Sequence, residues 1–412
     1  MPRNPDKKDY SGGFPVGFDK FIVIEDPRIG GNKRHHFGEI LFIAVSALVC
    51  GVSSFSGMVE FAHIHKAWLK KWIKLPNGVP VKQTIINLFS LMDSQQFGQC
   101  VVEHIKDLHP ELAKQLIAID GKTIRGSGKS NSEQEHCLSA WAADAGVTLA
   151  LEFVQKKSNE IPAIPLLLER LELEGHVVSM DAMGTQTVIA KKIRDKEADY
   201  ILALKRNQGR LHDEVIDQFH FASRQIAREV SEAWSLHEHV EKSNGRVCTR
   251  RVAVTNQLDW MQPSIRKKWK DLRSLVMVES ESYCLSEKRT TKQKRFYISS
   301  LEADAETFQK LIRQHWSIEW SGATWTGANA TCPEGFPGRE NQNGCHWVLD
   351  TLYREDLSQV RVKNAVRNFA VLRRMAHNIL KSDATIKKSL PMKQMRAMAD
   401  DDYRNTLLSL AG

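Results

Sequence analysis

The sequence predicts an α/β protein built on a mixed β-sheet that is flanked by helices. Two patterns support this prediction. Residues 37–108 repeat apolar side chains at helical spacing, and from residue 115 onward short apolar runs alternate with helical stretches. In order, the second region reads as a strand, a two-stranded hairpin, a helix, a strand, a helix, a strand and a helix. This order is typical of a sheet with helices packed on its faces.

The N-terminal third divides into two parts. Residues 1–36 are polar and contain four prolines, which predicts a flexible N-terminal arm. Residues 37–110 form the predicted helical N-terminal domain. Four of its lysines, at positions 66, 70, 71 and 74, lie among tryptophans. They form either the solvated face of an amphipathic helix or a surface that contacts DNA.

Five short apolar runs predict the strands of the sheet, at residues 116–119, 137–143, 147–154, 176–180 and 200–204. Residues 222–300 are again rich in strand-like runs. A basic stretch at residues 288–295 separates the last two of these runs. We interpret it as a loop that is either solvated or in contact with phosphate.

Charge and composition exclude several classes of protein. The chain of 412 residues has 58 Lys and Arg against 49 Asp and Glu, a net charge of +9, which favours a polyanionic partner. Residues 381–412 are predicted to be a basic C-terminal tail. The longest apolar run, residues 40–52, is too short for a bilayer, which requires about 20 apolar residues. With no signal peptide and no Cys-x-x-Cys pair, we expect a cytoplasmic protein without a membrane partner.

Two aspartates stand at the ends of predicted buried strands. Asp120 follows the first strand and Asp181 follows the fourth. If these strands are parallel neighbours, both carboxylates emerge at the same edge of the sheet, where they would suit Mg²⁺. The alternative is that each aspartate caps a turn. Glu319 is the candidate third acid, on a helix where Arg313 is placed either to bind phosphate or to form a surface ion pair.

Several longer strings resemble one protein family. They are residues 118–127 (AIDGKTIRGS), 180–182 (MDA), 198–208 (ADYILALKRNQ), 297–301 (YISSL), 313–319 (RQHWSIE), 346–350 (HWVLD) and 354–356 (RED). Over residues 37–380 the chain resembles the transposases of ISAs-type insertion sequences, the group that includes the H-repeat-associated proteins. The resemblance implies an RNase H-like core of the DDE superfamily at residues 111–221 and 301–380. A mostly β insertion at residues 222–300 would precede the last catalytic helix.

The resemblance also implies a chemistry. Asp120, Asp181 and Glu319 would be catalytic and would bind two divalent ions, usually Mg²⁺ with Mn²⁺ as an alternative. The enzyme would cleave the ends of an insertion sequence and join them to target DNA. A homodimer would hold the two ends. The residues implied to contact double-stranded DNA are Lys122, Arg125, Lys205 and Arg313, and those implied to support the site are Gln208, His315 and Trp316.

The chain departs from the family pattern directly after Glu319. In the family, Asn follows the glutamate and a His-Trp pair stands one helical turn later, whereas here His-Trp occupies positions 346–347. Residues 320–342 therefore resemble an inserted loop, and their four glycines and two prolines cannot continue a helix. Glu340, which Asn341 follows, is the alternative third acid.

Three hypotheses follow for the function. The first is an active metal-dependent DDE transposase, and the second is a transposase-derived DNA-binding protein that the 320–342 insertion has silenced. The third is an RNase H-like nuclease that cleaves DNA without joining it.

Overall fold

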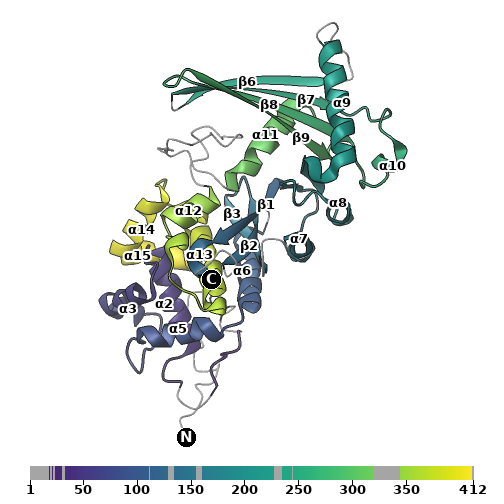
Figure 1. The fold of residues 1–412 in the computed structure, drawn as a ribbon. Helices are drawn as coiled ribbons and strands as arrows, with labels where there is room; N and C mark the ends of the chain where they lie inside the picture. Colours follow the sequence, from purple (N-terminus) through teal and green to yellow (C-terminus); the bar gives the residue numbers. More distant parts are fainter. Residues whose placement is uncertain are drawn as a thin grey trace.

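The computed structural model describes residues 18, 21, 24–29, 33–110, 112–128, 134–154, 160–226, 234–243, 245–318 and 344–410. These residues form a helical lobe near the N-terminus, a central sheet with helices packed on it, and a twisted β extension at the opposite end (Figure 1). A large mixed sheet flanked by helices confirms the predicted fold class. Among the described helices, none combines the length and the apolar character that a membrane span requires.

The helical lobe is built around one fully buried helix. Its helices are α2 (Phe37–Val49), α3 (Phe55–Ile64), α4 (Lys66–Leu69), α5 (Lys82–Leu91) and α6 (Ser94–Leu108). All 13 residues of α2 are buried, so this helix has no solvent face. The reason is that α2 is apolar almost all round, and such a helix is stable only when neighbours cover every side. The four lysines between residues 66 and 74 are exposed on and after α4.

One sheet of nine strands runs through the rest of the molecule, in the order β3-β2-β1-β4-β5-β9-β8-β7-β6. The first five strands in the chain are β1 (Leu116–Ile124), β2 (Glu135–Ala142), β3 (Val147–Val154), β4 (Val177–Met180) and β5 (Asp199–Leu204). β1 pairs antiparallel with β2 and parallel with β4, and β4 pairs parallel with β5. Helices α7 (Glu160–Glu169) and α8 (Thr187–Asp195) connect the parallel strands.

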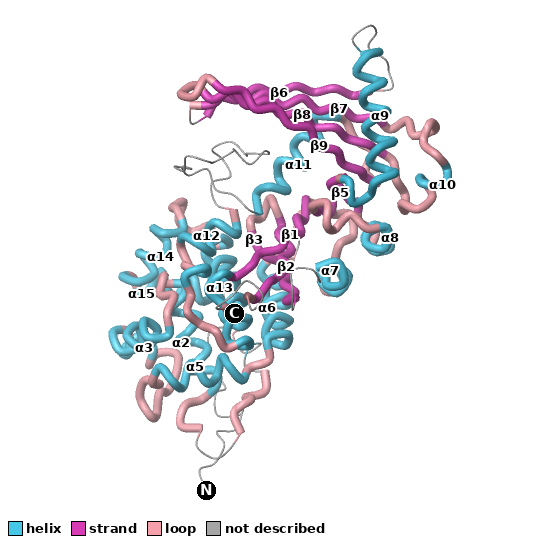
Figure 2. The backbone as a smooth tube through the Cα atoms, in the orientation of Figure 1, coloured by secondary structure: helices cyan, strands magenta, loops and turns pink. Residues whose placement is uncertain are grey.

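The β-rich region continues the same sheet (Figure 2). Its strands are β6 (Ser235–Ser243), β7 (Arg246–Thr255), β8 (Ser274–Cys284) and β9 (Arg289–Ser299), and β9 pairs antiparallel with β5. Helix α9 (Gly209–Ile226) precedes these strands and α11 (Ala305–His315) follows them.

The interpretation of residues 288–295 as a loop is wrong for most of this stretch. Residues 289–295 are part of β9 and pair along β8. Two of their lysines have carboxylate partners across the strands: Lys292 Nζ lies 3.2 Å from Glu281 Oε1, and Lys294 Nζ lies 3.9 Å from Glu279 Oε2. Residues 289–294 are all exposed, so both faces of this part of the strand are solvated, and the sequence lacks the apolar alternation by which a half-buried strand is predicted.

Helix α13 (Lys363–Ser382) joins the helical lobe to the sheet. Its apolar side chains belong to one core that also contains residues of α2, α5, α6 and β3. Its buried Asn378 accepts a hydrogen bond from Thr148 N (2.9 Å) and donates one to Thr148 O (2.8 Å). Thr148 lies in β3 at the edge of the sheet, so Asn378 satisfies backbone groups that an edge strand would otherwise leave unpaired.

The predicted C-terminal tail is folded. Helices α14 (Leu390–Ala399) and α15 (Asp401–Ser409) pack on the helical lobe. Arg404 is fully buried, and its guanidinium stacks over the Trp68 ring at 4.5 Å. Asn405 Oδ1 accepts hydrogen bonds from the indoles of Trp68 (2.8 Å) and Trp72 (3.2 Å). Part of the basic excess in this segment therefore lies inside the molecule.

The predicted N-terminal arm lies mostly outside the described residues. Two of its described residues, Phe18 and Phe21, are fully buried. Their rings contact Phe42 of α2 and Phe97 of α6, with centroids 5.3 and 6.2 Å apart. These two positions are therefore part of the core of the helical lobe.

Candidate active site

The two candidate aspartates come from neighbouring parallel strands. The register of β1 and β4 pairs Ile119 with Met180. The next position on each strand is Asp120 and Asp181, respectively, and neighbouring strands lie about 4.8 Å apart. Side chains alternate between the faces of a sheet, so these two residues share a face. The condition that brings both carboxylates to one edge is thus met.

A turn and two amides position Asp181. Its Oδ1 accepts hydrogen bonds from Met183 N (3.0 Å) and Gly184 N (3.4 Å), and the side chain is exposed. Asn207 Nδ2 donates to the carbonyl oxygen of Ala182, and Gln208 Nε2 donates to that of Thr185 (2.9 Å). Gln208 therefore holds the loop that carries Asp181, and its supporting role in catalysis stays a prediction.

Helix α12 (Cys345–Thr351) lies against Asp120. His346 Nδ1 is 3.6 Å from Asp120 Oδ2, and the Asp120 side chain is 17% exposed. Burial, followed by the charges of Lys122 and Arg374, holds the pKa of His346 well below its usual value. The imidazole is therefore neutral at physiological pH.

Lys122 lies two residues beyond Asp120 on the same strand face, and its cation is enclosed by acids. Nζ is 2.8 and 2.9 Å from the two carboxylate oxygens of Asp350 and 3.2 Å from Asp356 Oδ1. Burial alone would lower the pKa of Lys122, but Glu355, Asp350 and Asp356 outweigh it and raise the pKa. The side chain is only 7% exposed. The contact between Lys122 and phosphate therefore stays a prediction, and in this structure Asp350 and Asp356 neutralise the charge of Lys122.

A buried ion cluster fixes the turn that carries Asp356. This turn is η6 (Glu355–Leu357), and the Glu355 carboxylate is fully buried with Oε1 3.0 Å from Arg374 Nη1 and 3.8 Å from Arg373 Nη1. Burial raises the pKa of Glu355, but Arg374 and Arg373 outweigh it, so the net pKa is lowered. The carboxylate stays charged and links η6 to α13.

Two glycines allow close packing beside Asp120. A Cβ on Gly121 would lie 2.6 Å from His136 Nε2 and 3.0 Å from Glu160 Oε1. These two atoms lie 2.6 Å apart behind the strand. A Cβ on Gly126 would collide with the backbone carbonyls of residues 356 and 358, where η2 (Arg125–Ser127) meets η6. The Asp-Gly-Lys string therefore needs glycine for steric reasons.

The end of α11 lies on the same face as the aspartates. His315 Nδ1 is 2.8 Å from Ser179 Oγ, and Ser179 shares its face of β4 with Asp181. Burial, with a smaller contribution from Arg295, lowers the pKa of His315 to about 4. Trp141 Nε1 donates to Ser317 Oγ (3.2 Å), which fixes the chain shortly before the candidate third acid. Glu319, residues 320–342 and Glu340 lie outside the described residues.

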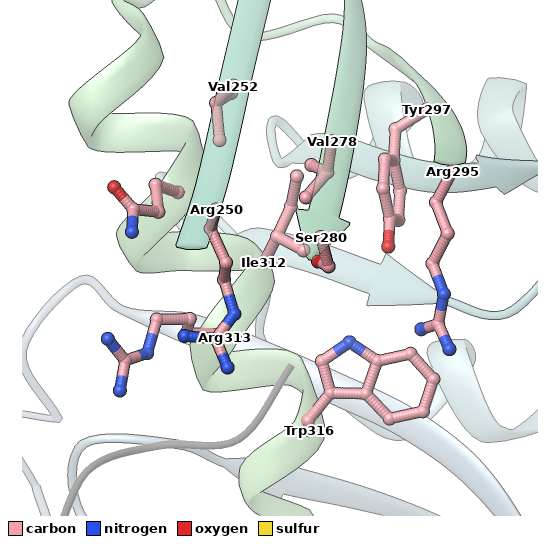
Figure 3. A pocket seen from close by; sticks show the side chains of 10 residues that line it. Arg250, Val252, Val278, Ser280, Arg295, Tyr297, Ile312, Arg313 and Trp316 are labelled. Atoms are coloured by element: carbon pink, nitrogen blue, oxygen red, sulfur yellow. The ribbon is translucent and has the colours of Figure 1, made fainter. Parts of the chain in front are cut away.

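Arg313 and Trp316 face the β extension. Arg313 Nη2 lies 3.1 Å from Glu241 Oε2 of β6, and Arg250 Nη1 lies 2.8 Å from Glu241 Oε1. The Arg295 guanidinium stacks over the Trp316 ring at 4.4 Å. Figure 3 shows these arginines and Trp316 around one pocket. In this arrangement Arg313 links α11 to the extension, and its contact with DNA stays a prediction.

Two of the four expected phosphate contacts are open to solvent. The Arg125 side chain is 80% exposed, although its Nε lies 3.6 Å from Asp356 Oδ2. Lys205 is exposed and directly follows β5, the parallel neighbour of β4. It therefore lies at the same edge of the sheet as Asp181.

Sequence reasoning assigned no role to His346, Asp350 or Asp356, although all three lie in the quoted strings. The signal was available in part, because His346 and Asp350 are four residues apart and so share a helix face. In the described part of the chain, no three His, Cys, Asp or Glu side chains cluster closely enough to hold a metal ion. The paired aspartates supply two hard oxygen ligands, and a complete site requires a further ligand from elsewhere.

Comparisons with known proteins identify the family. The family described as "Transposase DDE domain" matches residues 111–335, and the family described as "DDE_Tnp_1-associated" matches residues 18–105. "Putative transposase YncI" of Escherichia coli O157:H7 is 34% identical over 397 residues, covering 95% of this chain and 94% of the relative. "H repeat-associated putative transposase YhhI" of Escherichia coli K12 is 31% identical over 394 residues, covering 95% and 97%.

The paired aspartates lie in the region that matches the DDE domain, on the mixed sheet that an RNase H-like core requires. The expected resemblance to H-repeat-associated transposases is confirmed by a relative that carries this name. The chain belongs to the DDE superfamily of insertion-sequence transposases.

Proposed function

We propose that this transposase cleaves the ends of its insertion sequence and joins them to target DNA by metal-dependent phosphoryl transfer. One observation supports this proposal above all others. Asp120 and Asp181 directly follow Ile119 and Met180, which are register partners on the parallel neighbours β1 and β4, and that juxtaposition favours a shared cation.

The described donor atoms fit a divalent cation. Carboxylate oxygens are the ligands that Mg²⁺ and Mn²⁺ prefer. Asp120 and Asp181 would hold the metal, and we propose Glu319 as the third ligand and Glu340 as its alternative. When bound, a pair of such ions polarises the scissile phosphate and activates the attacking oxygen.

The neighbouring residues would maintain the charge and shape of this site. His346 packs against Asp120 with a neutral ring and so adds no positive charge that would compete with a bound cation. Lys122 prevents Asp350 and Asp356 from adding uncompensated negative charge near Asp120. Gln208 fixes the loop after Asp181, so that the carboxylate is held close to its working position.

Arg125 and Lys205 are the proposed phosphate contacts near the site. Both are exposed, and both lie on segments that leave the strands beside the aspartates. A guanidinium can bind phosphate in bidentate fashion, whereas an ammonium acts as a point charge. Because two element ends are joined in one event, we propose that two copies of the chain act together.

Cleavage of end DNA tests the proposal. The substrate is a duplex carrying the terminal sequence of the element that encodes the chain, incubated with Mg²⁺. Asp120→Asn and Asp181→Asn should each reduce cleavage more than about a hundredfold, since even residues that only orient metal ligands contribute 10–100-fold. Asp195→Asn is the matched control, because this exposed aspartate on α8 has Lys191 as its one ion-pair partner among the residues that the structure describes. Undiminished cleavage by Asp120→Asn would overturn the metal-site assignment.

Further variants resolve the open hypotheses. Glu319→Gln and Glu340→Gln identify the third acid, because loss of cleavage should follow from one of them alone. Deletion of residues 320–342 shows whether the insertion silences the enzyme. If the wild type does not cleave end DNA and the deletion variant does, the hypothesis that the present chain is active is contradicted. A precut end distinguishes a transposase from a nuclease, since only a transposase joins it to target DNA.

A further inference from the structure

A groove runs between the helical lobe and the turn that follows the candidate active site. It has a volume of about 650 Å³. One wall is the start of α3 with Lys82 and Ile86 of α5, and the other is residues 357–362 between η6 and α13. The groove thus lies where the associated N-terminal region meets the DDE region.

The groove is basic. Lys82, Arg354 and Arg361 line it, all three are exposed, and no residue in its lining is Asp or Glu. Among the described residues, none of these three cations is within ion-pair distance of a carboxylate, in contrast to Lys122 and Arg313. The acids next to Arg354 in the sequence point elsewhere, because Glu355 binds Arg374 and Asp356 binds Lys122.

Apolar side chains lie between these charges. Leu357 is 74% exposed and Val362 is 52% exposed, and both line the groove. Arg354 adopts the left-handed backbone conformation, with φ 50°. That conformation is strained for a residue with a Cβ, and such strain persists where the surrounding structure imposes it.

The groove is close to the paired aspartates. Its lining begins at Arg354, two residues before Asp356, and Asp356 Oδ1 is 3.2 Å from Lys122 Nζ. Lys122 is two residues from Asp120, about 7 Å along the strand. The near end of the groove is therefore roughly 10–15 Å from Asp120, and a DNA strand covers this distance in about three or four nucleotides at 3.4 Å each.

We propose that this groove binds the backbone of duplex DNA a few nucleotides from the phosphate held at Asp120 and Asp181. The occupant carries regularly spaced negative charge, which the three unneutralised cations match, and sugar surfaces, which Leu357 and Val362 contact. Such contacts set register on the duplex and do not read its sequence. The inference rests on the proposed function, because it places the same substrate beyond the reacting phosphate.

The salt dependence of DNA binding tests the inference. Binding of a short fluorescein-labelled duplex of random sequence is measured by anisotropy over a range of salt concentrations. Lys82→Gln with Arg361→Gln should lower the slope of log K against log salt by about 1.8, since each phosphate contact contributes about 0.9. The matched control is Lys267→Gln with Lys268→Gln, which removes two exposed lysines that directly follow α10 (Pro263–Arg266) and do not line the groove, and it should change the slope by less than about 0.5.

Each outcome either supports or overturns the inference. A lower slope of log K against log salt in the Lys82→Gln, Arg361→Gln double variant (the groove pair) but not in the control pair supports the inference. An unchanged slope in the groove pair, or equal losses of slope in both pairs, overturns it. The absence of DNA binding by the wild type, or binding of an acidic peptide in place of DNA, overturns it as well. Thermal melting verifies that each pair is folded. If the wild type cleaves end DNA while the groove pair keeps the wild-type slope, the proposal that the groove binds DNA is wrong and the proposed function is supported. If the groove pair loses slope while neither the wild type nor any variant cleaves end DNA, the groove binds DNA and the proposed function is wrong.

Discussion

Replacing Lys122 with methionine tests whether this lysine is structural or contacts DNA. Methionine retains the length and most of the apolar stem but removes the ammonium. Asp350 and Asp356 would then face one another without the cation that lies 2.8 and 3.2 Å from their oxygens. The variant therefore isolates the charge of Lys122 from its packing.

The expected loss of stability follows from the burial of the three groups. Removing one partner of a fully buried ion pair costs about 3–5 kcal/mol. Lys122 is 7% exposed, but Asp350 and Asp356 are 35% and 23% exposed, so water can hydrate both acids after the change. We therefore expect a decrease in unfolding free energy of about 2–3 kcal/mol.

Urea unfolding followed by tryptophan fluorescence measures this change. Lys70→Met is the matched control, because Lys70 is exposed and its substitution should stay within about 0.5 kcal/mol of the wild type. Adding Asp350→Asn should cost less in the Lys122→Met background than in the wild type, since that acid has then already lost its cation. DNA binding of the folded Lys122→Met protein should retain its salt dependence.

One pair of results would refute this reasoning. If Lys122→Met unfolds at the wild-type urea concentration and the slope of DNA binding falls by about 0.9, Lys122 contacts a phosphate. The prediction that Lys122 contacts DNA would then be supported.

Three further predictions concern stability. Gly121→Ala should lower the melting temperature by an amount that corresponds to a loss of about 1–3 kcal/mol in unfolding free energy, because the added Cβ would press on the buried His136 and Glu160 behind the strand. The control is Gly98→Ala in α6, where a Cβ meets open space, and it should raise the melting temperature. The pKa of His315 is about 4 in the folded protein and near 6.5 in the unfolded chain, so the unfolded chain binds the proton first as the pH drops. Stability should therefore fall between pH 6.5 and pH 4. In His315→Gln, the urea midpoint should fall less steeply over this pH range. Arg404→Ala should destabilise by about 3 kcal/mol or more in urea, since it removes the buried guanidinium from Trp68, and a change below 1 kcal/mol would contradict the docking of α15.

The sequence by itself determined the sheet and the position of its acids. Short apolar runs that end in Asp120 and Asp181 predict strands, and the order of strands and helices predicts a mixed sheet. Both features are local, because the apolar side chains of a short strand are visible in its own sequence. The fold class could therefore be predicted without a structure, whereas the parallel pairing of β1 with β4, which brings the two aspartates together, was only a condition until the tertiary structure showed it.

The tertiary structure alone decided which cations face solvent and which face carboxylates. Lys122 and Arg125 are close neighbours in the sequence, yet one is enclosed by Asp350, 228 residues away, and the other is 80% exposed. Arg404, counted within a basic tail, stacks inside the helical lobe. The physical reason is that periodicity reports which way a side chain points but not which distant element lies there. The packing of α12, η6 and α15 against residues far away in the chain decides which carboxylate or ring a cationic side chain meets. That packing therefore also decides whether the cation is available to DNA.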